Sequence, residues 1–283
     1  DPEAKGGIAA AKQLHGKELS YNNIVDMEAA WDLVCEWGED QPACVIIKHT
    51  NPCGAALGKD ALDAFQRAFN ADSKSAFGGI VAMNCDKAAA EAMKPIFFEV
   101  VMAPKFSQEA LDILETKKNI RLIEVPAAFK EELQLHKVSG GLLVQTPDNS
   151  AETRKDCKVV TKRAPTEEEW QAMEFAWKIV KHVKSNAIVL TGKDVTYGVG
   201  AGQMNRVGSA DIAIAEAGEK AKGSVMSSDA FFPFGDTIEA AGKAGVTAVI
   251  QPGGSIRDQE SIDMANKYGI AMVFTGHRHF RHS

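Results

Sequence analysis

The chain has 283 residues, of which 45% are hydrophobic and 25% are charged. This length can bury one large core or two ordinary ones, and the composition excludes a disordered, collagen-like or coiled-coil protein. The formal net charge of −6 argues against a broad nucleic-acid-binding surface, although it permits a local basic pocket for a small anion.

The hydrophobic runs and the cysteines exclude further classes of protein. No apolar run approaches the roughly 18 residues of a membrane-spanning helix, so we expect no membrane partner. The five cysteines show no C-x-x-C spacing, which indicates neither a disulfide framework nor a structural zinc site and favours a cytoplasmic protein. The sequence begins at Asp1 without an initiator Met or a signal pattern, and we therefore expect a fragment or a trimmed chain.

The first predicted elements alternate between helix and strand. A helical stretch opens at residues 27–31, a buried strand covers 43–47, and a glycine-containing loop follows at 51–54. A strand at 79–83, an apolar strand at 100–103 and a helix at 107–115 come next. Such alternation is typical of α/β layers.

A second series of elements repeats this order. A helical stretch opens at residues 173–177, and a strand at 186–190, a glycine-rich segment at 198–202, a strand at 249–251 and a helix at 258–268 follow. The repeat predicts a duplication with a mainly parallel sheet in each half. We divide the chain into domains 1–155 and 156–283, with the join before Thr166, a good helix N-cap, and we expect the halves to pack closely.

Lys48 and His49 directly follow the first buried strand. Open α/β sheets place ligands where strands end, an imidazole can act as a general base, and an ammonium group can stabilise negative charge. The alternative is a polar turn after a buried strand. Cys53 could be a nucleophile beside His49, but a small residue in a turn is the favoured interpretation.

Three segments of the second half offer anion- or ring-binding groups. Arg206 ends a glycine-rich loop that lacks the Lys-Ser/Thr of a P-loop, and it could bind phosphate or form a surface salt bridge. Three phenylalanines around Pro233 could form a pocket rim or a buried turn. The junction at residues 251–258 could receive an anion on its backbone N–H groups.

The C-terminal tail carries two arginines and three histidines within residues 277–282. An unremoved tag, a metal-binding tract and an anion-binding terminus are the alternatives. The interspersed Arg and Phe residues are not typical of a tag, and we favour the anion-binding terminus.

Taken in order, several of these segments resemble one family, the AICAR (5-aminoimidazole-4-carboxamide ribonucleotide) transformylase domain of the bifunctional purine-biosynthesis enzyme. They are residues 48–54, 75–79, 184–187, 200–203, 228–236, 251–257 and 278–282. The resemblance implies an α/β fold of duplicated cytidine-deaminase-like three-layer α/β/α units. The H-x-E and P-C-x-x-C signatures of zinc deaminases do not occur in the sequence, so the implied kinship is of fold and no zinc is expected.

The resemblance also implies a reaction, the transfer of a formyl group from 10-formyltetrahydrofolate to the 5-amino group of AICAR in de novo purine biosynthesis. It gives His49 the role of general base and Lys48 that of stabilising the tetrahedral intermediate, with His282 near the reaction centre. The implied nucleotide contacts are Gly78, Asn186, Arg206, Phe231, Asp236 and Arg278. The implied folate contacts are Phe77, Pro233 and Ser255.

The family further implies a homodimer whose subunits complete each other's folate cleft, and a potassium ion near Asp229 and Ser185. An upstream segment with a further substrate-binding arginine, and the ring-closing cyclohydrolase domain, have no match after Asp1, so we expect no ring closure from this chain. Two alternatives remain. One is a truncated nucleotide-binding module without catalysis, and the other is nucleobase deamination, which would require zinc.

Overall fold

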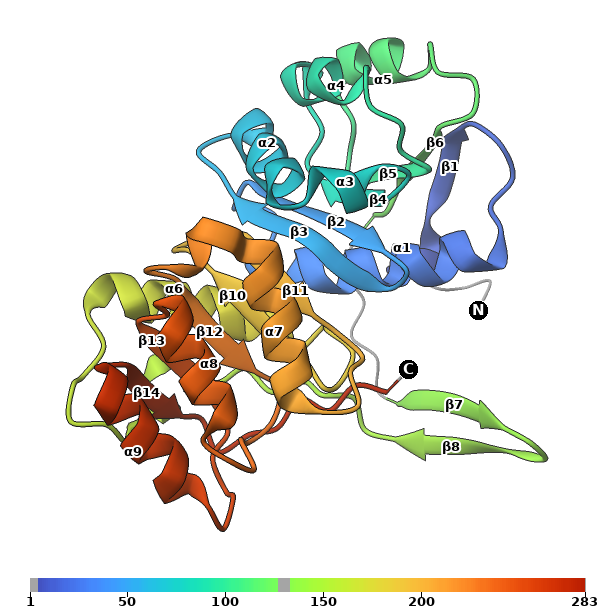
Figure 1. The fold of residues 1–283 in the computed structure, drawn as a ribbon. Coiled ribbons are helices and arrows are strands. Elements are labelled where there is room, and N and C mark those ends of the chain that lie inside the picture. Colours follow the sequence, from blue (N-terminus) through green and yellow to red (C-terminus); the bar gives the residue numbers. More distant parts are fainter. Residues whose placement is uncertain (1–4, 127–132, 283) are drawn as a thin grey trace.

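Two six-stranded sheets, each covered by helices on both faces, organise residues 5–126 and 133–282, which a computed structural model describes (Figure 1). The first sheet has the strand order β1-β6-β5-β4-β2-β3, and the second has the order β11-β10-β12-β13-β14-β9. In the first sheet β4, β5 and β6 are parallel to one another, and in the second sheet β12, β13 and β14 are. All other neighbouring strands are antiparallel.

The strands of the first sheet are β1 (Lys12–His15), β2 (Ala43–Lys48), β3 (Asn51–Leu57), β4 (Ile80–Met83), β5 (Val100–Ala103) and β6 (Arg121–Glu124). Its helices are α1 (Tyr21–Val34), α2 (Ala61–Ala71), α3 (Ser73–Ala76), α4 (Lys87–Met93) and α5 (Gln108–Leu114), with the short 3₁₀ helices η1 (Ile8–Ala10) and η2 (Cys35–Trp37).

The strands of the second sheet are β9 (Lys158–Val159), β10 (Ile188–Thr191), β11 (Thr196–Gly200), β12 (Val225–Ser228), β13 (Ala248–Gln251) and β14 (Ala271–Phe274). Its helices are α6 (Glu167–Val180), α7 (Arg206–Ala217), α8 (Asp236–Ala244) and α9 (Asp258–Tyr268), with the 3₁₀ helices η3 (Arg154–Asp156) and η4 (Gly218–Ala221).

The α/β class is confirmed, but the expectation of mainly parallel sheets is wrong. In the first sheet only the β4–β5 and β5–β6 pairs are parallel, and the β12–β13 and β13–β14 pairs correspond to them in the second. One reason is that β2 turns directly into β3, and β10 into β11, and hairpins join antiparallel strands. Residues 51–54, expected as a loop, therefore lie within β3.

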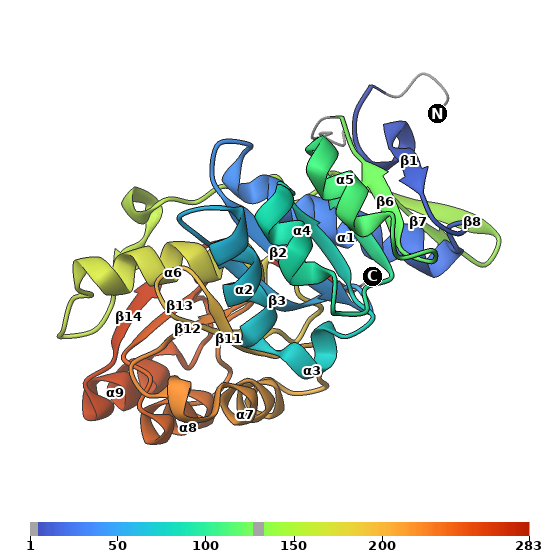
Figure 2. The same cartoon turned by 90° about the horizontal axis from the view of Figure 1, so that it is seen from above.

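Each half has three layers. In the first half, α1 covers one face of the sheet and α2, α4 and α5 cover the other. In the second, the strands lie between α6 on one side and α7, α8 and α9 on the other (Figure 2). Thr166 is the predicted N-cap of α6 and forms a capping box with Glu169, and Ser20 caps α1 in the same way with Asn23.

One hydrophobic core joins the two halves. It contains buried side chains of α1, of α6 and of both sheets. Trp37, just after α1, stacks on Phe175 of α6 with ring centroids 5.4 Å apart. At the sheet edges β3 meets the start of β11, where Thr196 Oγ1 accepts a hydrogen bond of 2.9 Å from the Ala55 N–H. The halves therefore pack closely, as the sequence predicts.

A hairpin formed by β7 (Gln134–Val138) and β8 (Gly141–Gln145) projects away from both sheets (Figure 1). The structure then returns through residues 146–153 to η3, where the predicted domain division at 155/156 falls. That division stays a prediction. Across the ranges 5–126 and 133–282, no helix combines the length and apolar character needed to cross a membrane.

A small polar cluster is buried where α1 meets α6. Glu36 Oε1 lies 2.8 Å from His182 Nε2 and 3.1 Å from Lys181 Nζ. Burial raises the pKa of Glu36, but the hydrogen bonds from His182 and Lys181 and the charge of Lys181 outweigh it and bring the pKa down to about 2. Burial lowers the pKa of His182, so the neutral ring donates from Nε2 and Lys181 carries the balancing charge.

Both pKa shifts predict that acid destabilises this join. A carboxyl group with a depressed pKa stabilises the fold above its unfolded pKa, near 4.5, and this contribution is lost as the pH falls towards 2. A histidine with a lowered pKa likewise loses its contribution as the pH falls below 6.5. We expect Glu36→Gln to lower the free energy of unfolding at neutral pH by about 2 kcal/mol, and to lower it less at pH 3.

Urea unfolding at several pH values measures this difference. The exposed Glu219 supplies a control, because Glu219→Gln should change the free energy of unfolding by less than about 0.5 kcal/mol. A Glu36→Gln effect that does not change between pH 7 and pH 3 would contradict the prediction.

Candidate active site

Lys48 is the last residue of β2, as the sequence predicts, and His49 lies in the tight hairpin turn that leads into β3 and not into a loop. Lys48 of β2 pairs with Asn51 of β3, and His49 and Thr50 between them have φ angles of 51° and 62°. Two successive left-handed residues make a type I′ turn, which favours Asn and Gly and is unusual for a β-branched Thr. Asp26 of α1 stabilises this strained turn, because its Oδ1 accepts a 2.7 Å hydrogen bond from the Thr50 N–H.

Lys48 reaches across to the loop before β4. Its Nζ donates a 2.8 Å hydrogen bond to the carbonyl of Phe77. Gly78 has a φ of +70°, and a Cβ at this position would lie 3.0 Å from the Lys48 Nζ. The Phe77 ring is 60% exposed and lies against Phe97. The structure thus brings Lys48, Phe77 and Gly78 together.

The second group of predicted residues centres on a buried ion pair. Arg206, the first residue of α7, pairs with Asp229, and the two residues are 6% and 0% exposed. The same guanidinium donates a 2.8 Å hydrogen bond to Asn186 Oδ1, and Asn186 Nδ2 donates to the Gln203 carbonyl. Neither proposed role for Arg206, as an open phosphate ligand or as a surface salt bridge, fits this burial. Arg206 instead orients the Asn186 side chain.

The carboxylate of Asp229 has partners on both oxygens. Oδ2 accepts a 2.5 Å hydrogen bond from Ser185 Oγ, and Oδ1 accepts from the Ala187 N–H as well as from Arg206. With its charge balanced by Arg206, this carboxylate does not fit a cation ligand for the implied potassium. Across the ranges 5–126 and 133–282, no group of three or more His, Cys, Asp or Glu side chains is arranged to hold a metal ion.

One hydrogen bond brings the two groups together within a single chain. Asn51 Oδ1, in the Lys48–His49 turn, accepts a 3.1 Å hydrogen bond from the backbone N–H of Lys184. Lys184 is two residues before Asn186, so the turn of the first half lies against the Asn186 segment of the second.

The tail is part of this arrangement. Ser185 and Arg281 exchange two hydrogen bonds, from the Ser185 N–H to the Arg281 carbonyl at 2.8 Å and from the Arg281 N–H to Ser185 Oγ at 3.0 Å. The exposed ring of Phe280 stacks on His282 and lies under the guanidinium of Arg278. The tail thus presents Arg278 and His282 beside the Asn186 segment, which does not fit a dangling tag.

The remaining predicted residues lie on loops around the second sheet. Phe231 is half-buried, Pro233 is exposed, and Asp236 is exposed at the start of α8. No hydrogen bond or ring contact among the described residues links Pro233 or Ser255 to the turn. At the anion site expected at residues 251–258, the chain's own Asp258 carboxylate takes the place of the anion. It accepts hydrogen bonds from the N–H groups of Gly254 and Ser255.

The phenylalanines around Pro233 fit both predicted alternatives, the buried turn and the pocket rim, at different positions. Phe232 is fully buried, whereas Phe234 is 48% exposed beneath the Arg257 guanidinium. The rejection of Cys53 as a nucleophile is supported, since burial raises the pKa of its thiol to about 12 and Sγ points to the Ile46 carbonyl.

Three residues support the site through contacts that the sequence does not reveal. Asp26 and Asn51 hold the turn, and His279 holds the tail through contacts described below. Asp26 lies 24 residues from its partner Thr50, and Asn51 lies 133 residues from Lys184. Spacing along the chain could not have revealed these contacts.

The contact between Gly78 and Lys48 gives a testable prediction. Gly78→Ala introduces a side chain at positive φ and crowds the Lys48 ammonium, whereas Gly38→Ala introduces one at a φ of +71° with no atom within 4 Å. We expect each variant to lose about 1 kcal/mol for its backbone, and Gly78→Ala to lose about 1 kcal/mol more with the Lys48–Phe77 hydrogen bond. Urea unfolding compares them, and equal losses would contradict the prediction.

Comparison with known proteins identifies the family of this chain. Residues 1–216 match the family model described as AICARFT/IMPCHase bienzyme. A bifunctional purine biosynthesis protein PurH from Bacillus subtilis (strain 168) is 61% identical over 282 residues, and one from Halalkalibacterium halodurans is 59% identical over 285 residues. These alignments cover 98% and 99% of this chain but 55% of each relative, so the chain spans about half the length of these relatives. By the extent of the family match and the identity of these relatives, the chain belongs to the AICARFT/IMPCHase bienzyme family.

Proposed function

We propose that this site transfers a formyl group from 10-formyltetrahydrofolate to the 5-amino group of AICAR, giving formyl-AICAR and tetrahydrofolate. The observation that carries the proposal is the Asn51–Lys184 hydrogen bond, because it holds the Lys48–His49 turn against the Asn186 segment. Family membership supplies the reaction class. The proposal concerns formyl transfer alone.

The chemistry needs a base and a positive charge at the reacting atoms. The amine of AICAR is a poor nucleophile because its lone pair is delocalised, so it must lose a proton as it attacks the formyl carbon. His49 is exposed on the turn and can accept that proton. The Lys48 ammonium, held by the Phe77 carbonyl, can stabilise the negative charge that grows on the formyl oxygen and can protonate the leaving folate nitrogen.

The nucleotide is proposed to lie between the turn and the second half. Arg278 is exposed and can reach a phosphate, while Asn186 offers a polar group oriented by Arg206. Gly78 allows the ring to approach the Lys48 loop closely, and Phe231 and Asp236 remain proposed contacts at the other side. Arg206 is now proposed to position Asn186 and not to bind phosphate itself.

The folate is proposed to use Phe77, Pro233 and Ser255, completed by a second subunit. Support for a homodimer comes from the β7–β8 hairpin, which projects apolar side chains on a two-stranded unit that is marginally stable alone in water. Leu135, Leu142 and Val144 lie on one of its faces and are 61%, 62% and 55% exposed. Covering that face would give the hairpin apolar contacts that the described part of its own chain does not provide.

The three-layer halves with matching strand orders support kinship of each half with the cytidine-deaminase-like fold, including the proposed duplication. No step of the proposed reaction involves potassium or zinc. The cytoplasmic location and the absence of nucleic-acid or membrane partners stay predictions.

Removing the proposed base should separate catalysis from binding. We expect His49→Ala to reduce formyl transfer by at least about 10²-fold, the usual contribution of a general base, while the Kd for AICAR changes less than about threefold. Release of tetrahydrofolate measures transfer, and calorimetry measures binding. His15→Ala, on β1, is the control and should keep its activity. AICAR binding without any transfer by the wild-type chain would instead support a nucleotide-binding module.

The dimer proposal is tested at the hairpin. We expect the double variant Leu135→Glu/Leu142→Glu to shift the chain from dimer to monomer in sedimentation experiments at micromolar concentration, because two carboxylates would then be buried in the apolar contact. Ile256→Glu, at a side chain that is fully exposed, is the matched control. A dimer that persists in the hairpin variant, or a monomeric wild type, would refute this role for the hairpin.

A further inference from the structure

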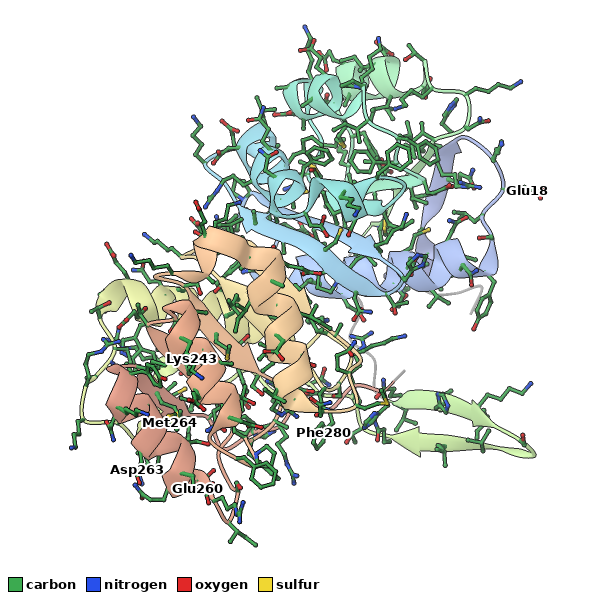
Figure 3. All side chains as sticks on the ribbon, viewed as in Figure 1. Glu18, Lys243, Glu260, Asp263, Met264 and Phe280 are labelled. Atoms are coloured by element: carbon green, nitrogen blue, oxygen red, sulfur yellow. The ribbon has the colours of Figure 1, made fainter. Side chains whose placement is uncertain are left out.

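The last residues form an extended segment whose side chains alternate between two sides. His279 is 1% exposed, and the Arg281 side chain is 25% exposed. Arg278, Phe280 and His282 are exposed, and Figure 3 shows Phe280 on the side of the second half turned away from α9. The inward residues therefore fix the tail, and the outward residues are free to meet a ligand.

His279 is held from three directions. Its ring lies 4.4 Å from that of Trp177 of α6, measured between centroids. Its Nδ1 lies 2.6 Å from Asp148 Oδ2, and since a carboxylate only accepts, the Nδ1 hydrogen is assigned to this contact. Its backbone N–H donates a 2.9 Å hydrogen bond to the carbonyl of Asp229.

A second carboxylate closes this pocket. Glu152 accepts a 3.1 Å hydrogen bond from Trp177 Nε1, lies 3.3 Å from His277 Nδ1 and lies 3.8 Å from His279 Nε2. Burial raises the pKa of Asp148, but hydrogen bonds from His279 and Ser150 outweigh it and hold that pKa well below its usual value. The segment joining the two halves thus supplies two acids to one buried ring.

We propose that His279 is a positioning residue that fixes the register of the tail, so that Arg278 and His282 face the nucleotide. This inference rests on the proposed function. In an extended chain, a slip of one residue turns every side chain to the other side. Such a slip would bury Arg278 and expose His279, and the imidazole in its pocket between Trp177 and Asp148 prevents it.

The surroundings of His279 connect the tail to the region where the two halves meet. Asp148 and Glu152 belong to the connecting segment, Trp177 and Ser185 to the second half, and Arg281 lies 4.0 Å from Asp32 of α1 in the first half. The tail therefore touches both halves and their connection. A change in their packing would move Arg278 and His282 relative to the Lys48–His49 turn.

The test removes the anchor while leaving the proposed ligand-binding side chains intact. We expect His279→Ala to speed amide hydrogen exchange of residues 278–282 at least tenfold and to raise the Kd for AICAR about tenfold, with exchange in the sheets unchanged. His279→Asn should restore at least half of the lost protection, because its amide can still donate to Asp148. His15→Ala, on β1, is the control and should change either value less than about twofold.

Asp148→Asn keeps the shape of the pocket but removes its charge, and it serves as a second variant if His279→Ala fails to fold. It should also loosen the tail at least threefold in exchange. Unchanged exchange of the tail in both folded variants, or a tail that loosens without weaker AICAR binding, would overturn the proposal. A wild-type chain that transferred no formyl group would refute the proposed function. The anchoring by His279 would still be decided by the exchange measurement, because that measurement needs no substrate.

Discussion

The buried pair of Arg206 and Asp229 is the interaction on which the site depends. The Asp229 carboxylate accepts hydrogen bonds from Ser185 Oγ and the Ala187 N–H. Its backbone carbonyl accepts one from the His279 N–H, and Arg206 also donates one to Asn186 Oδ1. Asp229 thus connects the Asn186 segment and the start of α7 through its buried carboxylate, and the tail through its backbone carbonyl. A buried charge is tolerated only when it is paired and hydrogen-bonded, so these groups constrain one another.

The two halves share a topology but use equivalent turns differently. The β2–β3 turn of the first half carries Lys48 and His49 in a strained conformation. The corresponding β10–β11 turn places Asp194 against the first half, where it pairs with Arg67 and accepts from the Leu57 N–H. Both turns therefore take part in joining the halves, and the shared core around α1 and α6 fixes the relative position of the halves.

Much of the fold follows from local features of the sequence. The repeat of helical and apolar segments predicted the α/β class and two similar halves, and Thr166 marked the start of α6 through its capping chemistry. Lys48, His49, Asn186 and Arg278 were found as chemical groups at the ends of predicted elements or in the tail. What the sequence could not supply was their environment, as Arg206 shows, since burial converts an apparent phosphate ligand into a structural ion pair.

By itself the sequence determined many of the segments that become helices and strands, the N-cap of α6 at Thr166, and which reactive side chains the chain offers, because each depends on neighbours a few residues apart. Only the tertiary structure decided the direction of strand pairing and the meeting of the turn, the Asn186 segment and the tail. These depend on partners such as Asn51 and Lys184, or Asp148 and His279, which lie 133 and 131 residues apart. Contacts at such separations leave no periodicity along the chain, since they arise only when the cores of both halves bring distant segments together.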